Sequence, residues 1–135
     1  MIYNLVEYVR IQLPSIRPIA NGRLLTEHLA QVVFNESGGV VNHQFPRTDK
    51  TIQITSYNDS GIEGREQLLS VYSLLKNKFR LVLPEVTVDG TVYPEVIAYQ
   101  VSPIQDVSYS GQDEQGMRMF DFNIVVTLQE EKSCP

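Results

Sequence analysis

The sequence contains no tryptophan, one cysteine and two histidines among its 135 residues. The cysteine, Cys134, cannot form an internal disulfide and cannot support a metal site built on thiolates, and this usage is consistent with a reducing cytosol. No run of about eighteen apolar residues occurs, so we expect no membrane-spanning helix. Glu7 and Arg10 interrupt the segment in which a signal peptide needs an unbroken apolar stretch, so export by that route is not expected.

Positive charge is also scarce. The chain has 11 Lys and Arg residues against 16 Asp and Glu residues, a net charge of −5. Such a balance opposes the phosphate-neutralising surface that tight nucleic-acid binding requires. It is compatible with DNA that slides past the protein, because a negative surface repels phosphates and does not trap them.

Sequence signatures of catalysis are missing. The chain has no glycine-rich phosphate loop, no His-Glu-x-x-His motif and no Cys-x-x-Cys motif. His28 and His43 lack helical spacing, so ordinary surface or core roles are favoured over a metal site. One acidic cluster lacks the Gly and the bidentate Glu of a calcium loop and is interpreted as a solvated loop: Asp106, Asp113, Glu114 and Asp121. We therefore expect no enzymatic activity, no metal and no cofactor.

The first part of the chain is predicted to hold one helix and two strands. Apolar residues recur at steps of three and four until Pro14, which predicts a helix over residues 2–13. Residues 15–23 are rich in turn formers and are expected to form an ordered linker. The apolar residues between Leu24 and Val33 also fit a helical stripe, but "AQVVFNE" is β-branched and aromatic, so residues 29–36 are predicted to form a strand. Residues 50–57 alternate apolar and polar side chains and predict a second strand.

A second helix is predicted over residues 61–80. Ser60 and Glu63 match the capping-box pattern at its start. Three basic residues crowd the predicted last turn, where the helix dipole favours cations: Lys76, Lys78 and Arg80. We expect the two helices to pack on the sheet through Leu5, Val6, Val9, Leu68, Tyr72, Leu75 and Phe79, over Phe120, Phe122, Ile124 and Val126.

The C-terminal part is rich in strand signals. Asp89-Gly90 between alternating residues predicts a type I′ hairpin. Residues 95–101 and 117–128 predict two further strands, and residues 102–116 are expected to form a long loop between them. The 135 residues suit one core, so we expect a single domain over residues 1–135. The predicted fold is α+β: a mainly antiparallel twisted sheet with two helices on one face, in the order α-β-β-α-β-β-β-β.

Several short motifs occur in an order that is typical of one family. The segment "ESGG" at residues 36–39 precedes "TIQITSY", then "EQLLSVYSLL", and the last predicted strand is "FDFNIVVTL". This order resembles the tail-terminator and minor capsid (head-tail joining) proteins of long-tailed phages, in which a "TGG" turn precedes a "P…FQI" strand and an "A…IY.LL" helix. Here Ser37 replaces the Thr, and "IQI" replaces "FQI". The resemblance covers residues 29–80 and 117–128, and none of its motifs is catalytic.

The resemblance implies a structural virion protein without turnover. A ring, expected to be a homo-hexamer, would cap the finished tail tube and then join it to the head connector. The implied partners are further copies of the chain, the tail tube protein and a head-completion or connector protein. The implied location is the tail and neck of the virion, with the host cytoplasm during assembly. Genome DNA would pass through the lumen without specific binding, past a hexamer of net charge 6 × −5 = −30.

The long predicted connection between the strands at 29–36 and 50–57 fits this role, because such loops are usually either binding loops or disordered. We interpret residues 38–50 and 106–116 as assembly loops; the alternative is a mobile loop without a partner. The candidate interface residues are Gly38, Gly39, Val40, His43, Phe45, Pro46, Asp49, Asp106, Tyr109, Asp113 and Glu114.

Two other functions stay open at the level of sequence. One is another neck component, such as a head-completion or stopper protein. The other is a small α+β enzyme or ligand-binding domain, which would need a concave apolar pocket with convergent polar groups.

Overall fold

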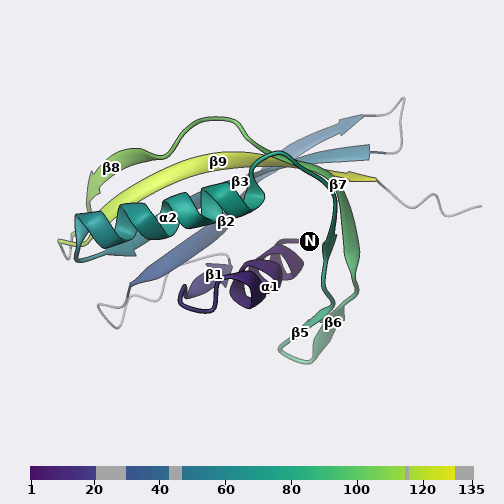
Figure 1. The fold of residues 1–135 in the computed structure, drawn as a ribbon. Coiled ribbons are helices and arrows are strands. Elements are labelled where there is room, and N and C mark those ends of the chain that lie inside the picture. The colour runs from purple at the N-terminus through teal and green to yellow at the C-terminus, as the bar shows by residue number, and fades with distance from the viewer. Residues whose placement is uncertain (21–29, 43–46, 115, 130–135) are drawn as a thin grey trace, which may run out of the picture.

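The computed structural model describes residues 1–20, 30–42, 47–114 and 116–129, with residues 37–42, 47, 48 and 129 described by their backbone alone. Figure 1 shows two helices against a strongly curled sheet. The elements along the chain are α1 (Ile2–Gln12), β1 (Pro18–Ala20), β2 (Gln31–Asn42), β3 (Arg47–Asn58), α2 (Gly61–Leu75), β4 (Lys78–Leu83), β5 (Val86–Val88), β6 (Thr91–Tyr93), β7 (Val96–Pro103), β8 (Ser108–Gln112) and β9 (Arg118–Gln129).

The main sheet has seven strands in the order β1-β2-β3-β9-β7-β4, and β8 also pairs with β9. The pairings are antiparallel except that of β1 with β2. β3 pairs along its whole length with one edge of β9. β7 and then β8 pair with the other edge of β9. The predicted α+β class with a mainly antiparallel sheet is confirmed. The predicted element order differs from the structure because it lacks β1, β4 and β8.

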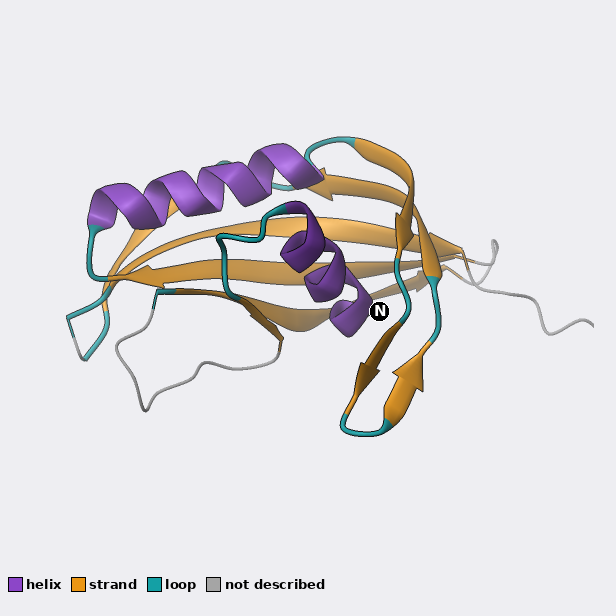
Figure 2. Ribbon diagram, turned by 60° about the horizontal axis from the view of Figure 1, so that its bottom comes forward, coloured by secondary structure: helices purple, strands orange, loops and turns teal. Residues whose placement is uncertain are grey.

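Both helices lie within the curl of the sheet (Figures 1 and 2), and one buried cluster joins them to it. The cluster is built from apolar side chains at helical spacing on α1 and α2 and from alternate residues of the central strands. Among its fully buried members are Leu5, Val9, Leu68, Leu75, Phe122, Ile124 and Val126. The predicted core is therefore confirmed apart from Phe79, which is 65% exposed.

The second helix ends five residues earlier than predicted. Its last residue is Leu75, and Asn77 adopts a left-handed backbone with φ of 49°, a conformation that asparagine tolerates better than most residues. The chain then enters β4, so Lys78 and Arg80 lie on a strand and not in a helical last turn. Phe79 is exposed although Leu81, two residues further on, packs against the core. Arg80 lies between them with a positive φ of 52°, which interrupts the regular alternation of side chains along the strand.

The start of α2 follows half of the predicted capping box. The Ser60 hydroxyl accepts a hydrogen bond from the Glu63 amide at 3.3 Å, as expected. The Ser60 amide, however, donates to Asn58 Oδ1 at 2.9 Å and not to the Glu63 carboxylate. The helix therefore begins where the sequence predicted, with Asn58 of the preceding strand in the role assigned to Glu63.

The predicted loop at 38–50 is wrong, because β2 and β3 continue as a paired hairpin through most of it. Gly39 pairs with Lys50 and Val40 with Asp49 after a β-bulge that follows Glu36. β3 is held on its other side by β9, which pairs with it as far as Arg47. The polar composition of this segment is typical of a loop, but strand neighbours on both sides determine its conformation.

Two shorter segments that were not predicted as strands are also strands, because a neighbouring strand pairs with each of them. Residues 15–23 were expected to be a linker, yet Pro18–Ala20 adds to the edge of β2 as a parallel strand. Residues 102–116 were expected to be a loop, yet Ser108–Gln112 pairs with β9. β8 is mostly solvent-exposed, so it has no apolar alternation from which it could have been predicted.

The predicted hairpin at Asp89-Gly90 is confirmed. Both residues have positive φ, 50° and 81°, as a type I′ turn requires. β5 and β6 pair only with each other and project from the body of the molecule as a separate arm (Figures 1 and 2). No helix in the described part of the chain is long and apolar enough to cross a membrane.

Candidate functional site

The structure separates the predicted interface residues. Gly38, Gly39 and Val40 lie within β2, and Asp49 lies within β3, where its carboxylate accepts a hydrogen bond from the Thr127 hydroxyl at 2.7 Å. These positions belong to the sheet and not to a loop. The remaining candidates of this set lie outside the described residues: His43, Phe45 and Pro46.

Two candidates of the second set hold local structure. Asp106 accepts a hydrogen bond from the Tyr72 hydroxyl at 3.1 Å, which ties the connection between β7 and β8 to α2. The Asp113 carboxylate accepts a hydrogen bond from the Met117 amide at 2.8 Å, which closes the turn between β8 and β9. Glu114 is exposed in that turn. The acidic cluster predicted as one solvated loop is therefore divided between two different turns and strand β9.

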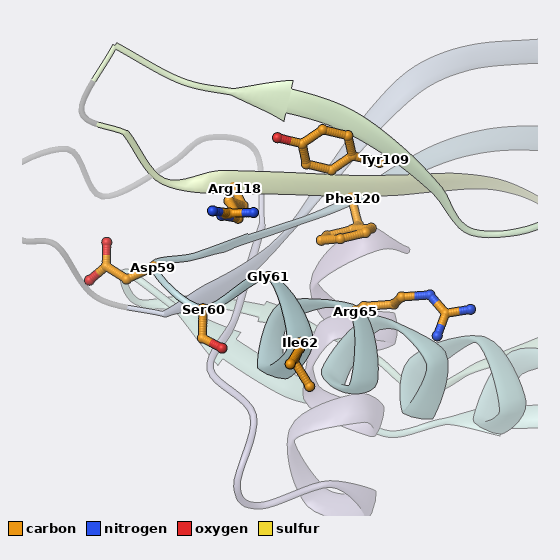
Figure 3. Close-up of a pocket in the computed structure, with 8 residues that line it drawn as sticks. All are labelled: Asp59, Ser60, Gly61, Ile62, Arg65, Tyr109, Arg118 and Phe120. Carbon is orange, nitrogen blue, oxygen red and sulfur yellow. The ribbon is translucent and has the colours of Figure 1, made fainter.

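Tyr109 is the candidate that faces a concave surface. An open depression of about 590 Å³ lies between the first turn of α2 and the paired strands β8 and β9. We call it the α2 depression (Figure 3). It is lined by Asp59, Ser60, Gly61, Ile62, Arg65, Tyr109, Arg118 and Phe120.

The α2 depression combines exposed apolar groups with positive charge. Ile62 is 74% exposed and Tyr109 53% exposed, and the Tyr109 ring lies 5.2 Å from that of Phe120. Arg118 packs against the start of the helix, where a Cβ on Gly61 would come within 2.9 Å of its Cδ. Among the residues that the structure describes, neither the Arg65 nor the Arg118 guanidinium has an ion-pair or hydrogen-bond partner.

A second exposed surface lies at the opposite end of the molecule. On the outer face of β4 and β7, Val82 is paired with Ile97, and both side chains are about half exposed. Phe79, on the same strand as Val82, is also exposed. We call this surface the β4–β7 outer face. It adjoins the β5–β6 arm, since the next strand pair toward the arm is Leu83 with Val96.

The β5–β6 arm is firmly attached at its base. The buried Asn4 side chain of α1 donates to the carbonyl oxygens of Pro84, Tyr93 and Pro94 at 3.0, 3.2 and 2.9 Å. The Tyr3 ring packs 4.8 Å from the Tyr93 ring. An isolated two-stranded hairpin is only marginally stable, so these contacts fix how the arm projects.

The sequence did not identify the arginines and Ile62 as parts of one surface. Arg65 and Arg118 are far apart in the chain, and the pairing of β3 with β9, which sets Arg118 opposite Asn58 just before α2, brings them together. One signal was available: Ile62 follows the helix cap and lies off the apolar face that Leu68, Val71 and Leu75 define.

The described ranges contain no candidate metal site. No three His, Cys, Asp or Glu side chains there are placed to hold a metal ion. His28 and His43 lie outside those ranges. The α2 depression has arginines and a tyrosine but no buried acid or base, so its chemistry suits recognition of an acidic, partly apolar group. No protein-family model and no curated protein matches this chain.

Proposed function

We propose that this chain is a structural protein of a long-tailed phage, six copies of which form a ring that caps the tail tube and joins it to the head connector. In this role it acts in the tail and neck of the virion and assembles in the host cytoplasm. It binds its own copies, the tail tube protein and a head-completion or connector protein, and it catalyses no reaction.

The sequence motifs that suggest this family are neighbours in the structure. "ESGG" lies in β2, "TIQITSY" in β3, "EQLLSVYSLL" in α2 and "FDFNIVVTL" in β9. β2, β3 and β9 are consecutive in the sheet, and α2 packs on β3 and β9. The resemblance is therefore carried by one contiguous half of the fold and not by scattered fragments.

The observation that carries the proposal is the presence of two different exposed surfaces at opposite ends of one chain. A closed ring of identical subunits uses heterologous contacts, in which each copy offers one patch to its neighbour on one side and a different patch to the other. The α2 depression and the β4–β7 outer face with its arm are such a pair (Figures 1 and 2). Single apolar residues scattered over a surface are normal and need no such explanation, whereas these exposed residues are grouped on two surfaces.

The charge of the chain also fits a ring around DNA. Six copies would carry a net charge of −30, and a lumen of that sign would let the genome pass without holding it.

The proposal is tested by removing the chain from a phage that encodes it and imaging the products by electron microscopy. A tube end that is never capped stays open to further addition and cannot join a head, so we expect filled heads, separate tails and no infectious particles. Complementation by the chain in trans restores joined particles. Normal infectious particles without the chain would overturn the proposal.

Another neck component remains the nearest alternative, because a stopper or head-completion protein shares the same neighbours. The same experiment separates the two. Tails of variable, excessive length indicate loss of the tube cap, whereas tails of uniform length beside DNA-free heads indicate loss of a head component.

A further inference from the structure

We infer that the β5–β6 arm of one copy docks in the α2 depression of the next copy. The inference rests on the proposed function, because it names the contact through which that ring would close. The occupant is a second copy of this chain, bound head to tail.

Charge complementarity is the first argument. Residues 84–95, which form the arm and its base, include three exposed carboxylates, those of Glu85, Asp89 and Glu95, and no Lys or Arg. The α2 depression contains the guanidinium groups of Arg65 and Arg118 against the single carboxylate of Asp59. Charge-assisted hydrogen bonds between a guanidinium and a carboxylate are among the stronger polar contacts at interfaces. The arm therefore has an excess of negative charge and the depression an excess of positive charge.

Apolar groups on the two surfaces are also complementary. Val92 on β6 is 55% exposed, and in the depression Ile62 and Tyr109 are exposed beside Phe120. Pockets of about 300–1,000 Å³ accommodate groups the size of a small ligand. The α2 depression, at about 590 Å³, thus has room for a two-residue turn with its flanking side chains.

Geometry decides between docking within a copy and docking between copies. The arm projects at one end of the molecule, and the first turn of α2 lies at the other, in both views of the fold (Figures 1 and 2). The arm cannot reach the depression of its own chain. A contact that joins opposite ends of successive copies repeats in one direction and closes into a ring or continues as a filament.

The arm is also preorganised for this contact. Asn4 and Tyr3 fix its base, so little backbone freedom is lost on docking. The adjoining β4–β7 outer face would enlarge the interface toward the area of about 1,200–2,000 Å² that stable complexes bury.

Charge reversal tests the contact. Asp89→Lys and Arg118→Glu each place like charges together, so each variant alone should self-associate at least about tenfold more weakly, measured by sedimentation over a concentration series. In a mixture of the two variants, the introduced lysine of one copy faces the introduced glutamate of the next, and the unchanged Asp89 and Arg118 meet at the following contact. The double variant restores an opposite-charge pair within one sequence. Both the mixture and the double variant should recover association.

Two further variants control for effects unrelated to the contact. Asp89→Asn removes the charge but keeps a residue suited to the turn, so it should give intermediate weakening. Glu66→Lys makes the same charge change on a different face of α2 and should have no effect on association.

Covalent capture makes the test independent of how weak the association is. In a Cys134→Ser background, Ile62→Cys and Thr91→Cys are combined and treated with a short bismaleimide. The double-cysteine variant should give a ladder of oligomers ending at six copies, and each single-cysteine variant should give nothing beyond dimer.

The outcomes separate the contact from the ring. Oligomers that form without the 62–91 ladder and ignore charge reversal would overturn arm docking and leave the proposed ring intact. Absence of any ladder and of any association, in solution and on tail tubes, would overturn both.

Discussion

The Asn4 side chain donates a hydrogen bond of 2.9 Å to the carbonyl of Pro94, a residue 90 positions away in the sequence. The same amide also reaches Pro84 and Tyr93, so one side chain of α1 binds both strands at the base of the β5–β6 arm. Asn4 is 1% exposed, so each of these hydrogen bonds has a buried donor.

We expect Asn4→Ala to lower the free energy of unfolding by about 1–3 kcal/mol, the usual cost of leaving buried polar groups without a partner. Urea titration measures the loss. Gln12→Ala, which removes an exposed amide from the same helix, is the control and should change stability little. Equal stability of the two variants would show that Asn4 does not hold the arm.

Leu75 and Phe79 should differ in how much stability the same truncation to alanine costs. Leu75 is fully buried, so Leu75→Ala should cost about 2–5 kcal/mol. Phe79→Ala should cost less than about 1 kcal/mol because its ring already lies in solvent. Denaturant unfolding of both variants checks the boundary between α2 and β4. A large loss of stability in Phe79→Ala would contradict this boundary and support the longer helix that the sequence predicted.

Gly64 should resist a substitution that normally stabilises helices. Replacing an interior helical glycine with alanine usually gains up to about 1 kcal/mol. Here a Cβ on Gly64 would lie 3.0 Å from Asn58 Cβ, because α2 packs tightly on the end of β3. We expect Gly64→Ala to destabilise by about 1–3 kcal/mol, as overpacking does. At Gly61 the nearest atom is the flexible Arg118 side chain, so Gly61→Ala should be tolerated; thermal melts of the two variants make the comparison.

The Tyr72–Asp106 contact should be visible as a pH effect. The hydrogen bond to the Asp106 carboxylate, with smaller contributions from burial and charge repulsion, raises the pKa of the Tyr72 phenol above its ordinary value of 10.0. A raised folded-state pKa favours the protonated phenol. The stabilisation is therefore complete below the unfolded pKa and is lost as the pH rises through the folded pKa.

The measurement is the titration of the Tyr72 ring resonances by NMR in the parent chain and in Asp106→Ala. The variant should titrate at lower pH than the parent. Asp59→Ala removes a carboxylate that does not contact Tyr72 and serves as the control. An unchanged Tyr72 titration in Asp106→Ala would mean that the hydrogen bond does not persist in solution.

The elements that the sequence predicted correctly are those whose signal is local. Apolar spacing located α1 and the core face of α2, and Asp89-Gly90 located the arm through the φ values that its turn demands. The errors occurred where distant strands determine the conformation. β8 forms because β9 offers it an edge, and the bulged half of β2 and β3 persists because β9 supports it.

The candidate site shows the same division. Tyr109 was predicted as an interface residue and does line the α2 depression, but Arg118 was not, because no pattern along the chain relates it to Arg65. The end of α2 was missed for a local reason. The apolar spacing from Leu75 to Phe79 continues past the end of the helix, and Asn77, whose left-handed backbone follows that end, was not recognised as a stop signal.

The central claim, that this chain forms a ring between tail and head, is tested most directly by counting its copies in purified particles of a phage that encodes it. Quantitative mass spectrometry against a labelled standard should find six copies per infectious particle, a ring mass of 6 × 15.3 = 92 kDa. The chain should stay with the tails when they are separated from the heads. Infectious particles that contain none of this chain would contradict the account.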